Sequence, residues 1–235
     1  MDKDEVKKFI ESIKKPKKLS DYCKKFHEHE VGDIAYIVSR SIVSKYQNNI
    51  GLKIAGAKII ILTWNAARFQ RLPQEVKNSL EKDIREAYEK TEEELRKLER
   101  KSLLNLDLAD NGLKKSIESI FSEFSSKNSI GFTGASKILH VLNPDVFMMW
   151  DTSIRDAYHE LHNKGHKKAD PECYLEFLKQ SQDIIAVLNK STEDLWKEHL
   201  EFLDKNLVKE FSYTESILKM LDEANYLRFK RNIKL

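Results

Sequence analysis

Lys137 is the residue of this sequence best suited to nucleophilic chemistry. It follows Gly134 by three residues, in the first turn of a helix predicted to begin at Ala135. The helix dipole disfavours a positive charge at that position, and burial beside Phe132 and Met148 would act in the same direction. Both effects lower the pKa of a lysine and free its amine as a nucleophile. The alternative is an exposed lysine that binds a phosphate or only water.

Asp151 supplies a carboxylate at the start of the next predicted helix. It precedes Thr152, and Arg155 lies one turn further along. The structural interpretation is an N-cap, whose side chain accepts hydrogen bonds from backbone N–H groups. The functional interpretation is a carboxylate that stabilises a developing positive charge and assists proton transfer. The two roles are compatible, because a helix N-terminus keeps a carboxylate ionised.

The segment Gly131-Phe132-Thr133-Gly134 is predicted to be a tight turn that opens the helix carrying Lys137. Backbone N–H groups at such a helix start point outward and form a phosphate site without side-chain charge. With Ser136 and Arg155, these four residues make the predicted nucleic-acid contact. An ordinary turn between two helices is the alternative.

The order of Gly131, Gly134, Lys137, Asp151 and Thr152 resembles the helix-hairpin-helix (HhH-GPD) DNA glycosylase superfamily, over roughly residues 113 to 160. The resemblance implies a catalytic pair, Lys137 and Asp151. The lysine would attack the sugar C1′, release the base and form a Schiff base, with or without strand cleavage as an AP lyase. It further implies DNA as the partner and, as the only cofactor, a monovalent cation held by hairpin carbonyls. The alternative function is a non-catalytic helix-hairpin-helix module that binds nucleic acid.

A base-acting enzyme must extrude its target nucleotide, and therefore needs aromatic side chains that stack or wedge. The candidates are Trp64, Phe69, Trp150 and Tyr158, although a core position is the favoured interpretation for each of them.

A third hypothesis, a metal hydrolase, depends on the histidine cluster His159, His162 and His166 with Glu160. Residues three apart share a helix face, so His159 and His162 could bind one metal ion. The spacing differs from the His-Glu-x-x-His zinc motif, and a polar helix end is the favoured interpretation. We therefore predict no metal site.

Composition predicts an all-α protein. The 235 residues include only seven Gly and four Pro, with 34% charged and 40% hydrophobic residues, and alternating strand patterns are absent. The net charge of +3 is small, so any basic surface must be local. Two cysteines, a charged start and no long apolar run predict a cytoplasmic, intracellular protein without a membrane partner. The oligomeric state stays open.

Apolar periodicity predicts the helices, and we expect a single all-α unit, divisible into lobes 1–110 and 111–235. The segment 52–70 is expected to be the most buried helix, and 74–102 a long exposed helix, or two with a break near Thr91. The other predicted helices cover 4–14, 20–30, 33–48, 113–126, 135–142, 152–163, 171–189, a segment starting at about 191, and 213–229.

Overall fold

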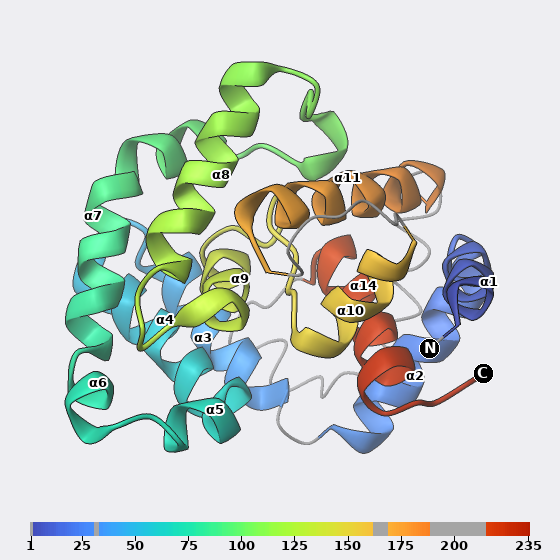
Figure 1. Cartoon of the computed structure of the whole chain (residues 1–235), viewed down its shortest axis with the longest axis horizontal. Helices are drawn as coiled ribbons and strands as arrows, with labels where there is room; N and C mark the ends of the chain where they lie inside the picture. Colours follow the sequence, from blue (N-terminus) through green and yellow to red (C-terminus); the bar gives the residue numbers. More distant parts are fainter. Residues whose placement is uncertain (1, 31–32, 162–168, 189–214) are drawn as a thin grey trace.

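The computed structural model describes residues 2–30, 33–161, 169–188 and 215–235. This part of the chain is all-helical, as predicted, with twelve α-helices and no strand (Figure 1). The α-helices are α1 (Lys3–Ile13), α2 (Pro16–His29), α3 (Asp33–Lys45), α4 (Ile50–Trp64), α5 (Ala66–Gln70), α6 (Gln74–Asn78), α7 (Leu80–Leu98), α8 (Asn111–Ser125), α9 (Gly131–Leu142), α10 (Thr152–Glu160), α11 (Pro171–Leu188) and α14 (Ile217–Asn225). A 3₁₀ turn, η1 (Leu103–Asn105), and a π-helical turn, η3 (Tyr226–Lys230), complete them.

Local signals in the sequence explain most helix starts. The side chains of Asn49, Asp110 and Asp151 accept hydrogen bonds from backbone N–H groups in the first turns of α4, α8 and α10. Pro16 opens α2, where its missing N–H costs nothing. These groups satisfy donors that the helix itself leaves unpaired.

Several predicted boundaries are wrong. The segment 52–70 divides at Asn65 into α4 and α5, and 74–102 divides near Ser79 rather than near Thr91. The helix that carries Lys137 begins at Gly131 instead of Ala135, because Gly131 adopts a φ of 65° and ends the preceding turn. The turn therefore ends at the first glycine, Gly131, and the second glycine, Gly134, lies inside the helix.

Helix α9 lies near the middle of the molecule and packs against α3, α4 and α8 (Figure 1). All of its residues from Gly134 to Val141 are buried. In α14 every residue from Leu218 to Asn225 is buried. The expectation that 52–70 is the most buried helix is wrong, since α4 exposes Leu62 and Thr63 to solvent while α9 and α14 are enclosed.

After α9 the chain makes a turn at 144–146, and the buried segment 146–150 that follows positions Asp151. His140 Nδ1 donates to the carbonyl of Phe147 (2.6 Å), and the Trp150 N–H donates to Ser136 Oγ (2.9 Å). Both bonds fasten the segment to α9 along its length. The start of α10 is thereby held beside the second turn of α9.

The two ends of the chain meet. Helix α14 packs on α2, and η3 packs on α10 (Figure 1). Lys234 pairs with Glu5 (2.8 Å), and the Leu235 N–H donates to the hydroxyl of Tyr22 (3.3 Å). Helices before and after residue 110 thus share contacts, while the division into two lobes stays a prediction. Within the described ranges, every helix is too short or too polar to cross a membrane.

Candidate functional site

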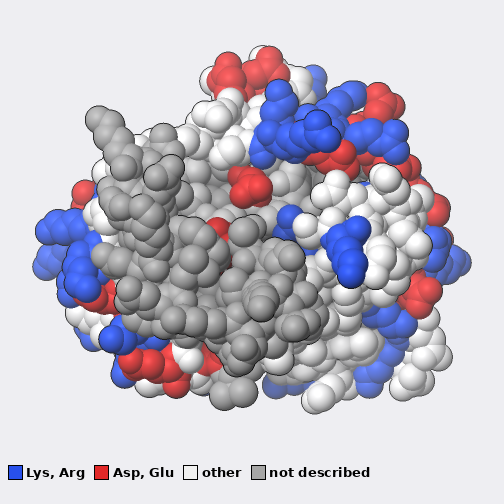
Figure 2. Space-filling view, turned by 180° about the vertical axis from the view of Figure 1, so that it is seen from behind, with Lys and Arg blue, Asp and Glu red and all other residues white. Residues whose placement is uncertain are grey.

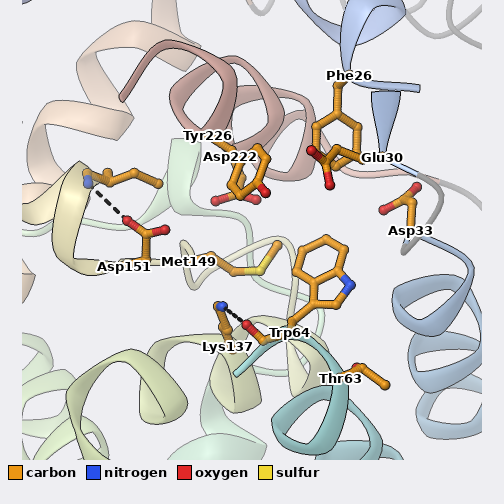
Figure 3. A pocket seen from close by; sticks show the side chains of 11 residues that line it. Phe26, Glu30, Asp33, Thr63, Trp64, Lys137, Met149, Asp151, Asp222 and Tyr226 are labelled. Carbon is orange, nitrogen blue, oxygen red and sulfur yellow. Dashed lines mark hydrogen bonds between the residues drawn. The ribbon is translucent and has the colours of Figure 1, made fainter. Parts of the chain in front are cut away.

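A cavity of about 260 Å³ lies between α2, α4, α9, α14 and the start of α10 (Figure 3). It brings together the two predicted catalytic residues, Lys137 and Asp151, from helices on opposite ends of the segment 143–150. The other residues that line it are Phe26, Glu30, Asp33, Thr63, Trp64, Met149, Ile154, Asp222 and Tyr226.

The amine of Lys137 points along the floor of this cavity toward the end of α4 (Figure 3). The residue is 9% exposed, and its Nζ donates to the carbonyl oxygen of Trp64 at 2.6 Å. Burial lowers the pKa of Lys137, while the negative charges of Asp151 and Asp222 act in the opposite direction. The predicted contribution of the helix dipole is wrong, because Lys137 is the seventh residue of α9 and lies beyond its first turn.

Asp151 is the N-cap of α10, as predicted. Its Oδ1 accepts from the N–H groups of Ser153 (2.9 Å) and Ile154 (3.0 Å), and the carboxylate faces the cavity (Figure 3). These two bonds fix the carboxylate against the helix start. The arrangement gives a charged group of fixed orientation on the cavity wall opposite Tyr226 and Asp222.

Asp222 is a cavity residue that the sequence analysis missed. It lies on α14, is 5% exposed, and points into the same space as Asp151 (Figure 3). Burial raises its pKa to about 8, with Asp151 adding to the shift and Lys219 and Lys137 opposing it. A signal existed in the sequence, because Asp222 falls four residues after Leu218 on the apolar side of the helix.

A buried ionic cluster lies directly beside the cavity and was also missed. The ammonium of Lys219, with 0% of its side chain exposed, lies 2.5 Å from Glu223 Oε1, 3.0 Å from Asp33 Oδ1 and 3.7 Å from Glu215 Oε1. His27 completes the cluster, with Nε2 at 3.2 Å from Glu223 Oε1. Although burial opposes it, Glu223 raises the pKa of His27.

This cluster has the composition of a metal site, since ligand atoms of His27, Glu215 and Glu223 lie within 4.8 Å of one another. However, the Lys219 ammonium already binds both glutamates. It is further enclosed by the rings of Phe26 (4.5 Å) and Trp64 (5.3 Å). The cluster is therefore a compensated ionic core that supports the cavity wall through Asp33.

The predicted nucleic-acid contact divides into exposed and buried parts. Gly131, Phe132 and Thr133 are partly exposed at the start of α9. Gly134 is buried, and a Cβ there would lie 3.0 Å from Ile61 Cδ1. Ser136 is 0% exposed. The prediction that Gly134 and Ser136 contact nucleic acid is therefore wrong: one allows α9 to approach α4, and the other holds the segment 143–150.

The hairpin carbonyls that would hold a monovalent cation are bound to a side chain. The guanidinium of Arg68 donates to the carbonyl oxygens of Asn128 (2.7 Å) and Ser129 (3.2 Å). It also fills the space beside Gly131, where a Cβ would lie 2.7 Å from its Nη2. Arg68 thus acts as the cation that orders this turn.

The other predicted functional residues are dispersed. Trp64 lines the cavity, whereas Trp150 and Tyr158 are core residues, 2% exposed. The ring of Trp150 stacks with Phe177, and Met149 lines the cavity. The last stacking candidate, Phe69, is partly buried against the core. Arg155, a predicted nucleic-acid contact, lies over the Trp150 ring at 5.7 Å from its centroid.

His159 is partly buried on α10, where Glu160 ends the helix. His162 and His166 lie outside the described residues.

Scans of the chain against protein-family models, curated proteins and solved structures find no match.

Proposed function

We propose that this protein is a DNA base-excision glycosylase that uses Lys137 as its nucleophile and Asp151 as its stabilising carboxylate. The observation that carries the proposal is that both side chains line one cavity, although they belong to different helices. A lysine and a carboxylate that converge on a pocket are the arrangement needed for covalent attack on an electrophilic carbon. The hairpin between α8 and α9 and the capped start of α10 agree with the helix-hairpin-helix resemblance.

The bond from Lys137 to Trp64 is compatible with nucleophilic attack. A neutral amine has two N–H groups and one lone pair, so it can donate to the Trp64 carbonyl and still direct the lone pair elsewhere. Burial favours this neutral form. The lone pair would attack C1′, the bond from C1′ to the base would break, and Asp151 would stabilise the positive charge on the sugar. The departing base would take up the proton that the attacking nitrogen loses, and breaking of the C1′–O4′ bond would open the sugar to the Schiff base. Elimination of the 3′ phosphate from this Schiff base would give the AP lyase activity.

The cavity has room for one extruded base beside an aromatic wall. Its volume is about 260 Å³, and Trp64, Phe26 and Tyr226 contribute rings. Stacking of a base on an aromatic side chain contributes about 1–3 kcal/mol. An enzyme that acts on a base in a duplex must first flip it into such a pocket.

Contact with the DNA backbone is expected at the start of α9. The preceding residue, Ile130, makes no side-chain cap, so the N–H groups of Phe132 and Thr133 remain available for a phosphate. Figure 2 shows Lys and Arg gathered toward the edges of one face, with Asp and Glu among them. The local N–H groups are therefore expected to matter more than the net charge of +3.

Borohydride trapping against a panel of damaged duplexes tests the proposal. The wild type should form a covalent complex with at least one lesion, and Lys137→Gln and Lys137→Arg should lose it while still binding DNA. Lys53→Gln is the matched control, because Lys53 is also 9% exposed and also donates one hydrogen bond, to Tyr88 (2.8 Å). A wild type that traps no lesion, or a Lys137→Arg variant that traps as well as the wild type, would contradict the mechanism.

The second candidate is a non-catalytic helix-hairpin-helix module that binds nucleic acid. The 2.6 Å hydrogen bond from Lys137 to the Trp64 carbonyl favours this second function. A charged ammonium in that position would neutralise the negative, C-terminal end of the α4 dipole. In that case Lys137→Gln would lower the melting temperature and leave DNA affinity unchanged. Salt-dependent DNA binding without any trapped complex would support this function.

A further inference from the structure

The carboxyl group of Asp222 is enclosed in the cavity without a bonding partner in the described part of the chain. Within the described ranges, its side chain makes no hydrogen bond or ion pair, although the residue is 95% enclosed. The other acids at the cavity differ: Glu30 pairs with Arg231 (2.6 Å), Asp33 with Lys219 (3.0 Å), and Asp151 with the start of α10. A buried polar group without a partner is costly, and a ligand is one way to satisfy it.

The charged groups around Asp222 come from every helix packed at this end of the cavity. Lys219 and Glu223 share α14 with it, Lys137 lies on α9, and Asp151 begins α10. Beyond them, Glu30 and Asp33 line the cavity with their partners, and His27 binds Glu223. Lys219 is already surrounded by three carboxylates, and Lys137 donates to Trp64, so neither cation is committed to Asp222.

We propose that Asp222 is the residue of the cavity that recognises the ligand. Its protonated carboxyl group donates a hydrogen bond to an acceptor ring nitrogen of a planar base. This inference rests on the proposed function, because it assumes that the cavity holds a nucleobase. A protonated carboxyl offers one O–H donor, whereas an ionised carboxylate can only accept. Asp151 lies in the same cavity with its charge fixed by two N–H groups, so a second ionised carboxylate beside it is disfavoured.

Asp151 and Asp222 have different roles because their surroundings differ. Asp151 accepts two backbone hydrogen bonds at the helix start and can stabilise a positive charge, whereas burial raises the pKa of Asp222, so that its carboxyl group can donate a hydrogen bond. The rings of Phe26, Trp64 and Tyr226 provide the stacking surfaces, and they have no preference among bases. Selection among bases would then depend on which ring nitrogen meets the Asp222 hydroxyl.

The test is the pH dependence of binding of two neutral bases, 9-methyladenine and 1-methylcytosine, to the intact protein by calorimetry. Binding should weaken as Asp222 ionises, by about tenfold between about pH 7 and about pH 9, given its pKa of about 8. Asp222→Asn keeps an N–H donor but cannot titrate, so it should bind as the wild type does at neutral pH and lose the pH dependence. In a set of 9-methyladenine analogues, each with one ring nitrogen replaced by C–H, only the analogue that lacks the accepting nitrogen should bind more weakly.

Controls separate this inference from the proposed function. Asp156→Asn changes a carboxylate that is 46% exposed on α10, and should keep the wild-type pH profile. A pH dependence in Asp222→Asn as strong as that of the wild type would show that another group controls binding and would overturn the inference. The inference is overturned if neither base binds, if affinity is independent of pH, or if it rises with pH, as a cationic ligand would require. If Lys137-dependent trapping succeeds and the pH dependence is absent, only the role of Asp222 fails. If the pH dependence is present and trapping is absent, only the catalytic proposal fails.

Discussion

Replacing Lys219 with Met should destabilise the protein strongly, because it leaves buried carboxylates without their counter-ion. The ammonium lies 2.5 Å from Glu223 and 3.0 Å from Asp33, and its side chain is fully enclosed. Breaking a buried ion pair by removing one partner costs about 3–5 kcal/mol. Met has a similar volume, so the loss should come from the uncompensated charge rather than from a cavity.

The pH dependence of this loss follows from the same charges. Burial raises the pKa of Glu215 and the charge of Lys219 opposes that shift, so without the ammonium the folded-state pKa of Glu215 should rise further above its unfolded value. The folded state then binds more protons than the unfolded state above about pH 4, so the stability of the variant falls as pH rises. The difference from the wild type should be larger at about pH 8 than at about pH 5.

Chemical denaturation followed by circular dichroism measures both effects. Lys97→Met is the control, because Lys97 also pairs with a glutamate four residues away, Glu93 (2.8 Å), but is 66% exposed. A solvated pair contributes little, so this variant should unfold nearly as the wild type does. A Lys219→Met variant that is no less stable than Lys97→Met at about pH 8, or that loses more stability at acidic pH, would contradict this prediction.

Two further predictions concern the core. Gly56→Ala should cost about 1–3 kcal/mol in thermal or chemical unfolding, because a Cβ would lie 3.0 Å from the carbonyl oxygen of Ser39 on α3. Burial lowers the pKa of His140 to about 3, so the unfolded state binds the extra proton between about pH 3 and about pH 6.5. Stability should therefore fall on acidification below about pH 6.5, by up to about 1.4 kcal/mol per pH unit, and His140→Gln should flatten that slope; equal slopes in both proteins would contradict this role for His140.

The sequence by itself determined the all-α class, because apolar residues repeat at helical spacing along the described chain. It also determined the cap at Asp151, which needs only a carboxylate before a helical pattern. Boundaries at glycines were less predictable. Gly131 takes a positive φ while Gly134 is an ordinary helical residue, and local sequence does not distinguish the two.

Only the tertiary structure decided what surrounds Lys137. Its pKa is lowered by burial against α4 and α14, and its hydrogen-bond partner is 73 positions away in the chain. Asp222 illustrates the same limit. Its pKa depends in part on Asp151 and Lys137, which folding brings to it from two other helices. Desolvation and charge interactions act over a few ångströms in space, whereas periodicity and capping act over a few residues along the chain.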